Sequence, residues 1–468
     1  MPFQVSPGVL VREVDLTNVV PAVSTSIGAV AGAFEKGPVG EITAVSSEEE
    51  LVRLFGKPNG SNFETFFTAS NFLQYGNALR VVRAESGVTN AMSGGSGLLI
   101  KSDTHYQDNY SAGEASSGEW GARTAGTHGN SLGVSMCIGT LAYEENLGSS
   151  NQTVGEDAVG ATVIKVDAGT AFNVGDLISF SSADASSDAT AFAHIAGDEG
   201  NEYEITAINT HDLTVRLKDD PNGSGVKAII PDNTFIRRRW AFYDLFDTPP
   251  GTSTYATGKG FTDDEMHIVV FDRTGLISGF RKDTAGERTN SVLETYPFMS
   301  MFKNATNEQG SSIYAKDVIN ERSEYIYWVN WDSDYRAEGA NTILSADSAN
   351  DTNLSKATFN SVAEFNFQGG ANSSALGISE YATGYDLFED KDQVEIDFLI
   401  SPSLVTRSDH TTVANDLVAT AASRKDCVAV ISPARSDVVD LTNASTITDN
   451  IVDTAKAITP FSSYAFMD

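Results

Sequence analysis

The order of apolar and polar residues predicts strands alternating with helices at both ends of the chain. Near the start, the small apolar run at 26–34 is typical of a buried strand, and a second strand is expected at 41–45. A helix follows in "SSEEELVRLFGKP", where Ser46 or Ser47 caps the first turn and Gly56 marks the end. Strands that alternate with helices predict a sheet covered by helices.

A helix with a phenylalanine-rich face follows over 62–76 and a strand over 78–84. The same alternation returns near the other end of the chain. Asp409 is the expected N-cap of a later helix. The elements predicted at the far end are strands at 392–401 and 426–432 and helices at 409–424 and 446–458. Neither end has enough strands for a good sheet alone, so we expect one discontinuous α/β domain with the middle of the chain inserted.

The middle of the chain is mainly extended. Residues 162–217 show period-two alternation around a "VGD" turn, which predicts a small antiparallel barrel with a loop at 181–201. Further strands are expected at 266–272 and 323–331. The predicted fold class is therefore α+β or α/β and multidomain. The predicted domains are an extended N-terminal arm at 1–20, an α/β core at 21–84 and 316–468, a second, mixed α/β domain at 85–141 and 236–315, and a β-barrel-like protrusion at 142–235.

Charge and cysteine content exclude several classes of protein. Lys and Arg number 31 against 63 Asp and Glu, a net charge of −32, which argues against binding to nucleic acid or to an anionic membrane. Two interpretations of this charge stay open. The charge serves solubility alone, or it forms a surface that meets a basic partner or other copies of the chain, which then associate against repulsion. Cys137 and Cys427 lie in unrelated contexts, so neither a disulfide nor a Cys-based metal site is expected. The start of the chain has no signal-peptide pattern, so we expect a cytosolic protein.

Signatures of catalysis are missing from the sequence. It contains neither a G-x-S-x-G elbow nor a Walker A motif, and its six histidines form no zinc-binding pattern. We therefore predict no enzyme activity and no cofactor. One basic run stands out in this acidic chain: Arg237, Arg238 and Arg239. Two interpretations stay open for these arginines, namely ion pairs with acids of the same chain or a contact with an acidic neighbouring subunit.

An ordered set of segments resembles the tail sheath proteins of contractile bacteriophages, in particular those of T-even-like phages. No single motif is decisive, but the set covers most of the chain in order. The segments are "SPGVLVREVD" (6–15), "AVAGAFEKGPVGEITAVSSEEELVRLFGKP" (29–58), "FLQYGNALRVVRA" (72–84), "HGNSLGVSM" (128–136), "RRRWAFYDLF" (237–246), "DVINERSEYIYW" (317–328) and "VEIDFLISPS" (394–403).

The resemblance implies a structural subunit of the virion tail sheath, assembled in the host cytoplasm. Such subunits form six-fold rings stacked helically around a tail tube, next to baseplate and tail terminator proteins, and contract to drive the tube through the host envelope for genome delivery. The resemblance also implies an N-terminal arm that adds a strand to a neighbouring subunit's sheet. The matching arm residues are Val9, Leu10, Val11, Arg12, Glu13 and Val14.

Two departures from the family qualify this expectation. Family members usually continue beyond a position such as Asp468, so we expect a C-terminal segment to be missing, with consequences for tube binding and polymerisation. The module at 142–235 is also placed unlike the T-even protrusion, and its role is either decoration or glycan adhesion. Alternatives at the level of the whole chain are the sheath of a tailocin or related injection system, and a receptor-binding or glycan-binding virion module.

Overall fold

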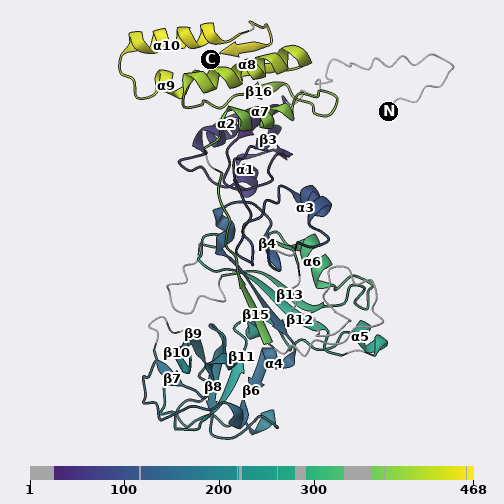
Figure 1. The fold of residues 1–468 in the computed structure, drawn as a ribbon, viewed down its shortest axis with the longest axis vertical. Coiled ribbons are helices and arrows are strands. Elements are labelled where there is room, and N and C mark those ends of the chain that lie inside the picture. The colour runs from purple at the N-terminus through teal and green to yellow at the C-terminus, as the bar shows by residue number, and fades with distance from the viewer. Residues whose placement is uncertain are drawn as a thin grey trace, which may run out of the picture. The chain divides into compact units, whose positions relative to one another are not determined.

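The computed structural model divides the chain into two compact units (Figure 1). The residues it describes are 26–114, 117–218, 220, 224–260, 262–279, 291–330, 361–373, 375–459 and 461–467. Unit 1 comprises Met1–Phe34, Ile42–Ala84 and Leu376–Asp468, and unit 2 comprises Glu35–Glu41 and Glu85–Ala375. Unit 1 is thus built from both ends of the chain.

A six-stranded sheet forms the centre of unit 1. Its order is β18-β17-β16-β1-β3-β2, and every neighbouring pair is parallel except β2 with β3. The strands are β1 (Gly28–Gly32), β2 (Ile42–Val45), β3 (Leu79–Arg83), β16 (Phe398–Ile400), β17 (Val428–Ile431) and β18 (Ala465–Met467). Because β1 lies between β3 and β16, the sheet joins the two ends of the chain, as the alternation of strands and helices predicts.

Helices cover this sheet from both sides. One core packs α1 and α2 against β1 and β3 and includes Val30, Leu51 and Phe66. The other packs α7 and α8 against Ala31, Leu399 and residues of β17. The helices of unit 1 are α1 (Glu48–Phe55), α2 (Phe63–Leu73), α7 (Ile378–Asp386), α8 (Arg407–Arg424), α9 (Arg435–Val438) and α10 (Ala444–Ala457).

Helix starts show where the sequence rules succeed and where they fail. Ser47 is the N-cap of α1, and its hydroxyl accepts a hydrogen bond from the Glu50 backbone N–H at 3.2 Å. The cap predicted for α8 is wrong: Thr406 caps this helix and Asp409 lies in its first turn. Both residue types suit the cap, but only Thr406 has the extended backbone that a cap requires.

Unit 2 contains a four-stranded sheet in the order β13-β12-β5-β15 and a two-stranded sheet of β14 and β4. Their strands are β4 (Trp120–Ala122), β5 (Leu132–Ile138), β12 (Glu265–Asp272), β13 (Val292–Ser300), β14 (Ile326–Trp328) and β15 (Ser361–Asn366). The α-helices are α3 (Asp103–Asn109), α4 (Thr140–Tyr143), α5 (Thr254–Lys259) and α6 (Ala315–Arg322), and the 3₁₀ helices are η1 (Thr127–Ser131), η2 (Gly148–Ser150), η3 (Gly169–Ala171), η4 (Ala189–Ala191) and η5 (Tyr243–Leu245).

The predicted return to the core at residue 316 differs from the structure, in which unit 1 resumes at Leu376. The reason is strand pairing. β14 pairs with β4, and β15 pairs with β5, so both strands belong to unit 2. A strand pattern in the sequence shows that a segment is extended, but it does not show which strand becomes its neighbour.

The remaining part of unit 2 is a six-stranded antiparallel sheet, which we call the β module. Its strands are β6 (Glu144–Asn146), β7 (Val163–Lys165), β8 (Leu177–Ser181), β9 (Tyr203–Asn209), β10 (Asp212–Leu217) and β11 (Phe235–Arg239), in the order β6-β11-β8-β9-β10-β7. In the described part of the chain, β6 and β7 do not pair, although isolated bridges join Thr153 to Val166 and Gln152 to Phe235. The predicted antiparallel module is therefore present, whereas a closed barrel is not established.

No described helix combines the length and the apolar character needed to cross a membrane.

Candidate assembly surfaces

The predicted arm, Val9 to Val14, lies outside the described residues. The point at which the chain enters unit 1 is nevertheless well defined. The Ile27 N–H donates a hydrogen bond to the Asp397 carboxylate at 2.7 Å. The Ile27 carbonyl accepts bonds from the backbone N–H groups of Asp397 and Phe398, at 2.8 and 3.1 Å. The chain therefore reaches β1 beside the first residue of β16.

Two outer strands of the unit 1 sheet are candidate acceptors for a further strand. Among the described residues, no strand pairs with the outer edge of β18 or of β2. An outer strand presents unpaired backbone groups to which another chain can bind. The β18 side is also apolar, since Phe466 is 50% exposed and Phe461, just before the strand, is 84% exposed.

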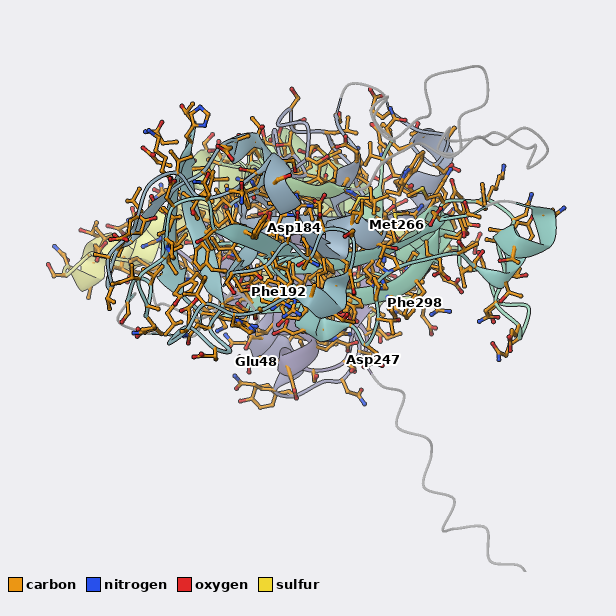
Figure 2. The ribbon with its side chains drawn as sticks, turned by 90° about the horizontal axis from the view of Figure 1, so that it is seen from below. Glu48, Asp184, Phe192, Asp247, Met266 and Phe298 are labelled. Atoms are coloured by element: carbon orange, nitrogen blue, oxygen red, sulfur yellow. The ribbon has the colours of Figure 1, made fainter. Side chains whose placement is uncertain are left out.

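The predicted basic run lies on β11, in the β module. Arg238 pairs with Glu145 at 2.7 Å and also donates to the Leu141 carbonyl at 3.1 Å. The Arg237 guanidinium lies 4.0 Å from the ring centroid of Phe192, which is labelled in Figure 2. Its Nε also donates to Ser179 at 3.2 Å. A cation on an aromatic face is attracted by the negative face of the ring.

Arg239 belongs to a network centred on Glu202. It donates to Glu144 at 2.5 Å and to Glu202 at 2.7 Å. Glu202 also accepts a bond from the Tyr243 hydroxyl at 2.8 Å and lies 3.5 Å from the Lys218 ammonium, which pairs with Asp244 at 3.2 Å. Burial alone would raise the pKa of Glu202, but the bonds from Tyr243 and Arg239 lower it below its usual value.

This network fixes the β module to the segment that follows it. Glu202 immediately precedes β9, Lys218 follows β10, and Tyr243 lies in η5, on the path from β11 to β12. A network of partly buried charges holds its members in one geometry when each charge has a partner. We name Glu144, Glu202, Lys218, Arg239, Tyr243 and Asp244 the junction network.

Ion pairing within the chain thus accounts for Arg238 and Arg239. The alternative, a contact with an acidic neighbouring subunit, stays a prediction. Sequence reasoning missed the acidic partners, although a signal was present. Glu144 and Glu145 belong to β6, which pairs antiparallel with β11 and places them opposite Arg239 and Arg238. Complementary runs of charge in two short segments are typical of neighbouring strands.

Other polar side chains act as structural hydrogen-bonding groups. His267 donates from Nε2 to the Thr248 carbonyl at 2.9 Å, and its Nδ1 accepts the Phe298 N–H at 3.1 Å. Both cysteines are buried, and burial raises the pKa of each thiol. In the described ranges, no group of three or more His, Cys, Asp or Glu side chains is placed to hold a metal ion.

Comparison with known proteins gives a consistent result. The family model described as "Tail sheath protein Gp18 domain III N-terminal region" matches residues 25–84, which belong to unit 1 except for 35–41. A tail sheath protein of Vibrio phage KVP40 is 46% identical over 78 residues, which cover 17% of this chain and 12% of that protein. The tail sheath protein of Enterobacteria phage T4 is 25% identical over 496 aligned residues, covering 96% of this chain and 64% of the relative.

These matches confirm the resemblance to phage tail sheath proteins that the sequence predicts. The chain spans about two thirds of the length of the T4 relative, namely 64%. A solved sheath tail protein of Listeria innocua aligns with 93% of this chain and 57% of its own, at 9% identity and a TM-score of 0.34.

Proposed function

We propose that this chain, similar along its length to phage tail sheath proteins, is a structural subunit of a contractile tail sheath. The observation that carries the proposal is the match to the T4 tail sheath protein over 96% of the chain. In this role, subunits form six-fold rings that stack helically around a tail tube and meet baseplate and terminator proteins. Contraction drives the tube through the host envelope, and the chain has no catalytic role.

The physical requirement of this function is a body that moves without deforming. A sheath shortens when subunits rotate and slide about their interfaces, so each subunit must keep its internal packing. The junction network favours such behaviour in unit 2, because it ties the β module to the segment leading into β12 through several charged contacts. The free energy of contraction is then stored in the interfaces between subunits.

Connection between subunits is proposed to come from the N-terminal arm. Val9 to Val14 add as a strand to the sheet of a neighbouring unit 1, where backbone hydrogen bonds give a link that persists while the bodies move. Unit 1 is suited to accept such a strand, because the outer edge of β18 is unpaired among the described residues and Phe466 beside it is half exposed. Arg237 to Arg239 are proposed as a secondary contact with an acidic neighbour.

Immunogold labelling of virions tests the function directly. Antibodies raised against residues 1–468 are applied to particles of the phage that encodes the chain, and the label is located by electron microscopy. We expect gold along the whole outer tail in extended particles and on the shortened, widened sleeve in contracted ones. Label confined to the capsid, the tail tip or the tail fibres would overturn the proposal. Antibodies against the tail tube protein of the same phage serve as the control, since the sheath covers the tube.

A further inference from the structure

One face of the unit 1 sheet carries apolar side chains that are only partly covered by the described residues. Phe398 pairs with Val428, Ile400 pairs with Val430, and Val430 pairs with Phe466, so these side chains form one row across β16, β17 and β18 and a second row across β16 and β17. Alternate residues of a strand point to opposite faces, which places them on the side away from the core under α8. We define the open face as Phe398, Ile400, Val428, Val430 and Phe466.

Burial supports this assignment. Leu399, Ala429 and Ile431, on the opposite face of the same strands, are at most 1% exposed and belong to the core with α8. The open-face residues are part of neither hydrophobic core of unit 1, and Phe466 is 50% exposed. On their side of the sheet, α1 and α2 belong to the core over β1, β2 and β3. Phe398, Ile400, Val428 and Val430 are partly exposed, and in the described part of unit 1 neither hydrophobic core takes in this half of the sheet on its α2 side.

The size of the open face indicates what covers it. A stable interface between two subunits buries about 800 Å² per partner and takes in about 20–30 residues a side. Five side chains on three short strands supply only a fraction of that area. The open face therefore fits a single short segment with a few apolar side chains rather than a second folded subunit. A contiguous apolar surface of this kind commonly marks a binding site.

We propose that residues 16–23 of the same chain cover the open face. Residues 1–25 are the long stretch of unit 1 outside the described range, and they rejoin it at Ser26, beside β16. Within that stretch, 16–23 reads "LTNVVPAV" and supplies four large apolar side chains. These are Leu16, Val19, Val20 and Val23. Pro21 has no N–H to donate, so the segment binds through its side chains rather than as an inner strand.

The reach of the segment agrees with this placement. Strands of a sheet lie about 4.8 Å apart, so β18 lies about 14 Å from β1 across β16 and β17. An extended chain spans about 3.3 Å per residue. The eight residues of 16–23 therefore cross all three strands, and Ser24 and Thr25 connect them to the start of β1. The inference does not rest on sheath assembly, because it concerns the free subunit and leaves Val9 to Val14 available for a neighbour.

Thiol accessibility tests the proposal in the chain of residues 1–468. A cysteine is introduced at the centre of the open face by Val430→Cys, and the rate of its reaction with a charged thiol reagent is measured. The comparison site is Val405→Cys, because Val405 is 64% exposed on a loop of the same unit. The parent protein gives the background, since Cys137 and Cys427 are buried. We expect reaction at position 430 to be slower than at 405 by at least about tenfold, because a covered side chain reacts only when its cover opens.

Variants of the segment decide what provides the protection. Leu16→Asp/Val19→Asp/Val20→Asp is expected to raise the reaction rate at position 430 by about tenfold. The matched control is Thr17→Asp/Asn18→Asp, which adds charge at polar positions and is expected to leave the rate unchanged. Circular dichroism establishes that each variant is folded. If the triple variant does not fold, the single variant Val19→Ser replaces it, and the reaction rate of the cysteine at position 430 is again expected to rise.

Three results would overturn the proposal. The first is equal reactivity at positions 430 and 405 in the parent chain, which means that nothing covers the open face. The second is protection that survives substitution of the segment. The third is protection that grows with protein concentration over about a hundredfold range, since mass action then assigns the cover to another copy. Concentration-independent protection that the apolar substitutions remove supports the assignment.

Discussion

His267 shows how the surroundings of one side chain fix its protonation state. Its ring stacks on Phe246 with centroids 4.2 Å apart, and both ring nitrogens are used by the neutral form. Nδ1 accepts the backbone N–H of Phe298, a residue with a positive φ of 52° that is labelled in Figure 2. A proton on Nδ1 would face that N–H directly. Burial among aromatic rings also disfavours the charged imidazolium, and this burial lowers the pKa of His267 below its usual value.

The first prediction is a loss of stability in mild acid. Because the pKa of His267 is lower in the folded than in the unfolded chain, the unfolded state binds the extra proton first. The contribution to stability is complete above the unfolded pKa of about 6.5 and is lost as the pH falls through the folded pKa. Chemical denaturation of unit 2 between about pH 7.5 and 5 measures this slope. His267→Gln, which keeps hydrogen-bonding capacity but does not titrate, is expected to flatten it, and an unchanged slope would contradict the prediction.

The second prediction concerns Gly28, where β1 passes close to α2. A Cβ at this position would lie 2.7 Å from the Phe72 ring and 3.0 Å from the Leu79 side chain. Gly28→Ala is therefore expected to lower the free energy of unfolding by about 1–3 kcal/mol through overpacking. The matched control is Gly60→Ala, where nothing lies within 4 Å of the new Cβ, with an expected change within about 0.5 kcal/mol. Equal effects of the two substitutions in urea denaturation would rule out the steric explanation.

At the scale of elements, the junction network determines how firmly the β module is held. Arg239 donates to two acids, one on β6 and one before β9, so its removal leaves two partly buried carboxylates without this partner. An exposed ion pair such as that of Arg53 with Glu50 in α1 contributes little by comparison, because water screens it. The two pairs therefore provide a matched comparison within one chain.

The third prediction is a coupling between Arg239 and Glu202. Arg239→Leu is expected to destabilise the β module by about 1–3 kcal/mol, while Arg53→Leu changes the stability of unit 1 by at most about 0.5 kcal/mol. A double-mutant cycle with Glu202→Gln should give a coupling energy of about 0.5–3 kcal/mol. Additive effects of Arg239→Leu and Glu202→Gln would mean that the contact contributes nothing to the stability of the module.

Much of unit 1 could be predicted from the sequence, because its signals are local. Ser47 with the acidic first turn of α1 marks a helix start within a few residues, and the apolar run at 26–34 contains β1. Pairing between distant segments could not be predicted in the same way. The pattern at 323–331 predicts a strand, but the assignment of β14 to unit 2 depends on its pairing with β4, some 200 residues away in sequence.

The candidate surfaces show the same contrast between local signals, which the sequence reveals, and contacts between distant segments, which it does not. Arg237 to Arg239 stand out by composition, whereas their partners depend on register and on residues such as Glu202 that come from another part of the chain. The open face was not predicted, because half-buried residues such as Val428 and Val430 have the same sequence pattern as residues buried on both faces. A strand buried on both faces and a strand covered on one face are told apart only in the structure, where α2 packs over β1 and β3 and, among the described residues, belongs to no core with β17.

At the scale of the whole molecule, the dominant property is charge. A net charge of −32 means that copies of the chain repel one another, so an apolar contact between subunits must overcome that repulsion. Salt reduces the repulsion, since the Debye length falls from about 30 Å at 0.01 M to about 10 Å at 0.1 M. Contacts between a basic run and an acidic neighbour respond in the opposite direction.

The fourth prediction is that salt promotes self-association. Static light scattering of the full chain should show association that increases as ionic strength rises from about 0.01 M to 0.15 M. Replacing Arg237 with Gln, which leaves the partners of Arg238 and Arg239 in place, should not change the sign of this dependence. Association that decreases with salt would contradict the prediction and would assign the main contact between copies to opposite charges.

The pairing of β6 with β11 has a consequence for how such a chain can diversify. The chain enters the β module through β6 and leaves it through β11, and Asn146 lies opposite Arg237. The chain between these positions leaves and re-enters the rest of unit 2 through one pair of neighbouring strands, while Glu202 and Lys218 hold it to Tyr243 and Asp244. Loops of the module that carry none of these side chains can therefore change in length and sequence in evolution, and they offer an engineer an anchored position for displaying a foreign peptide.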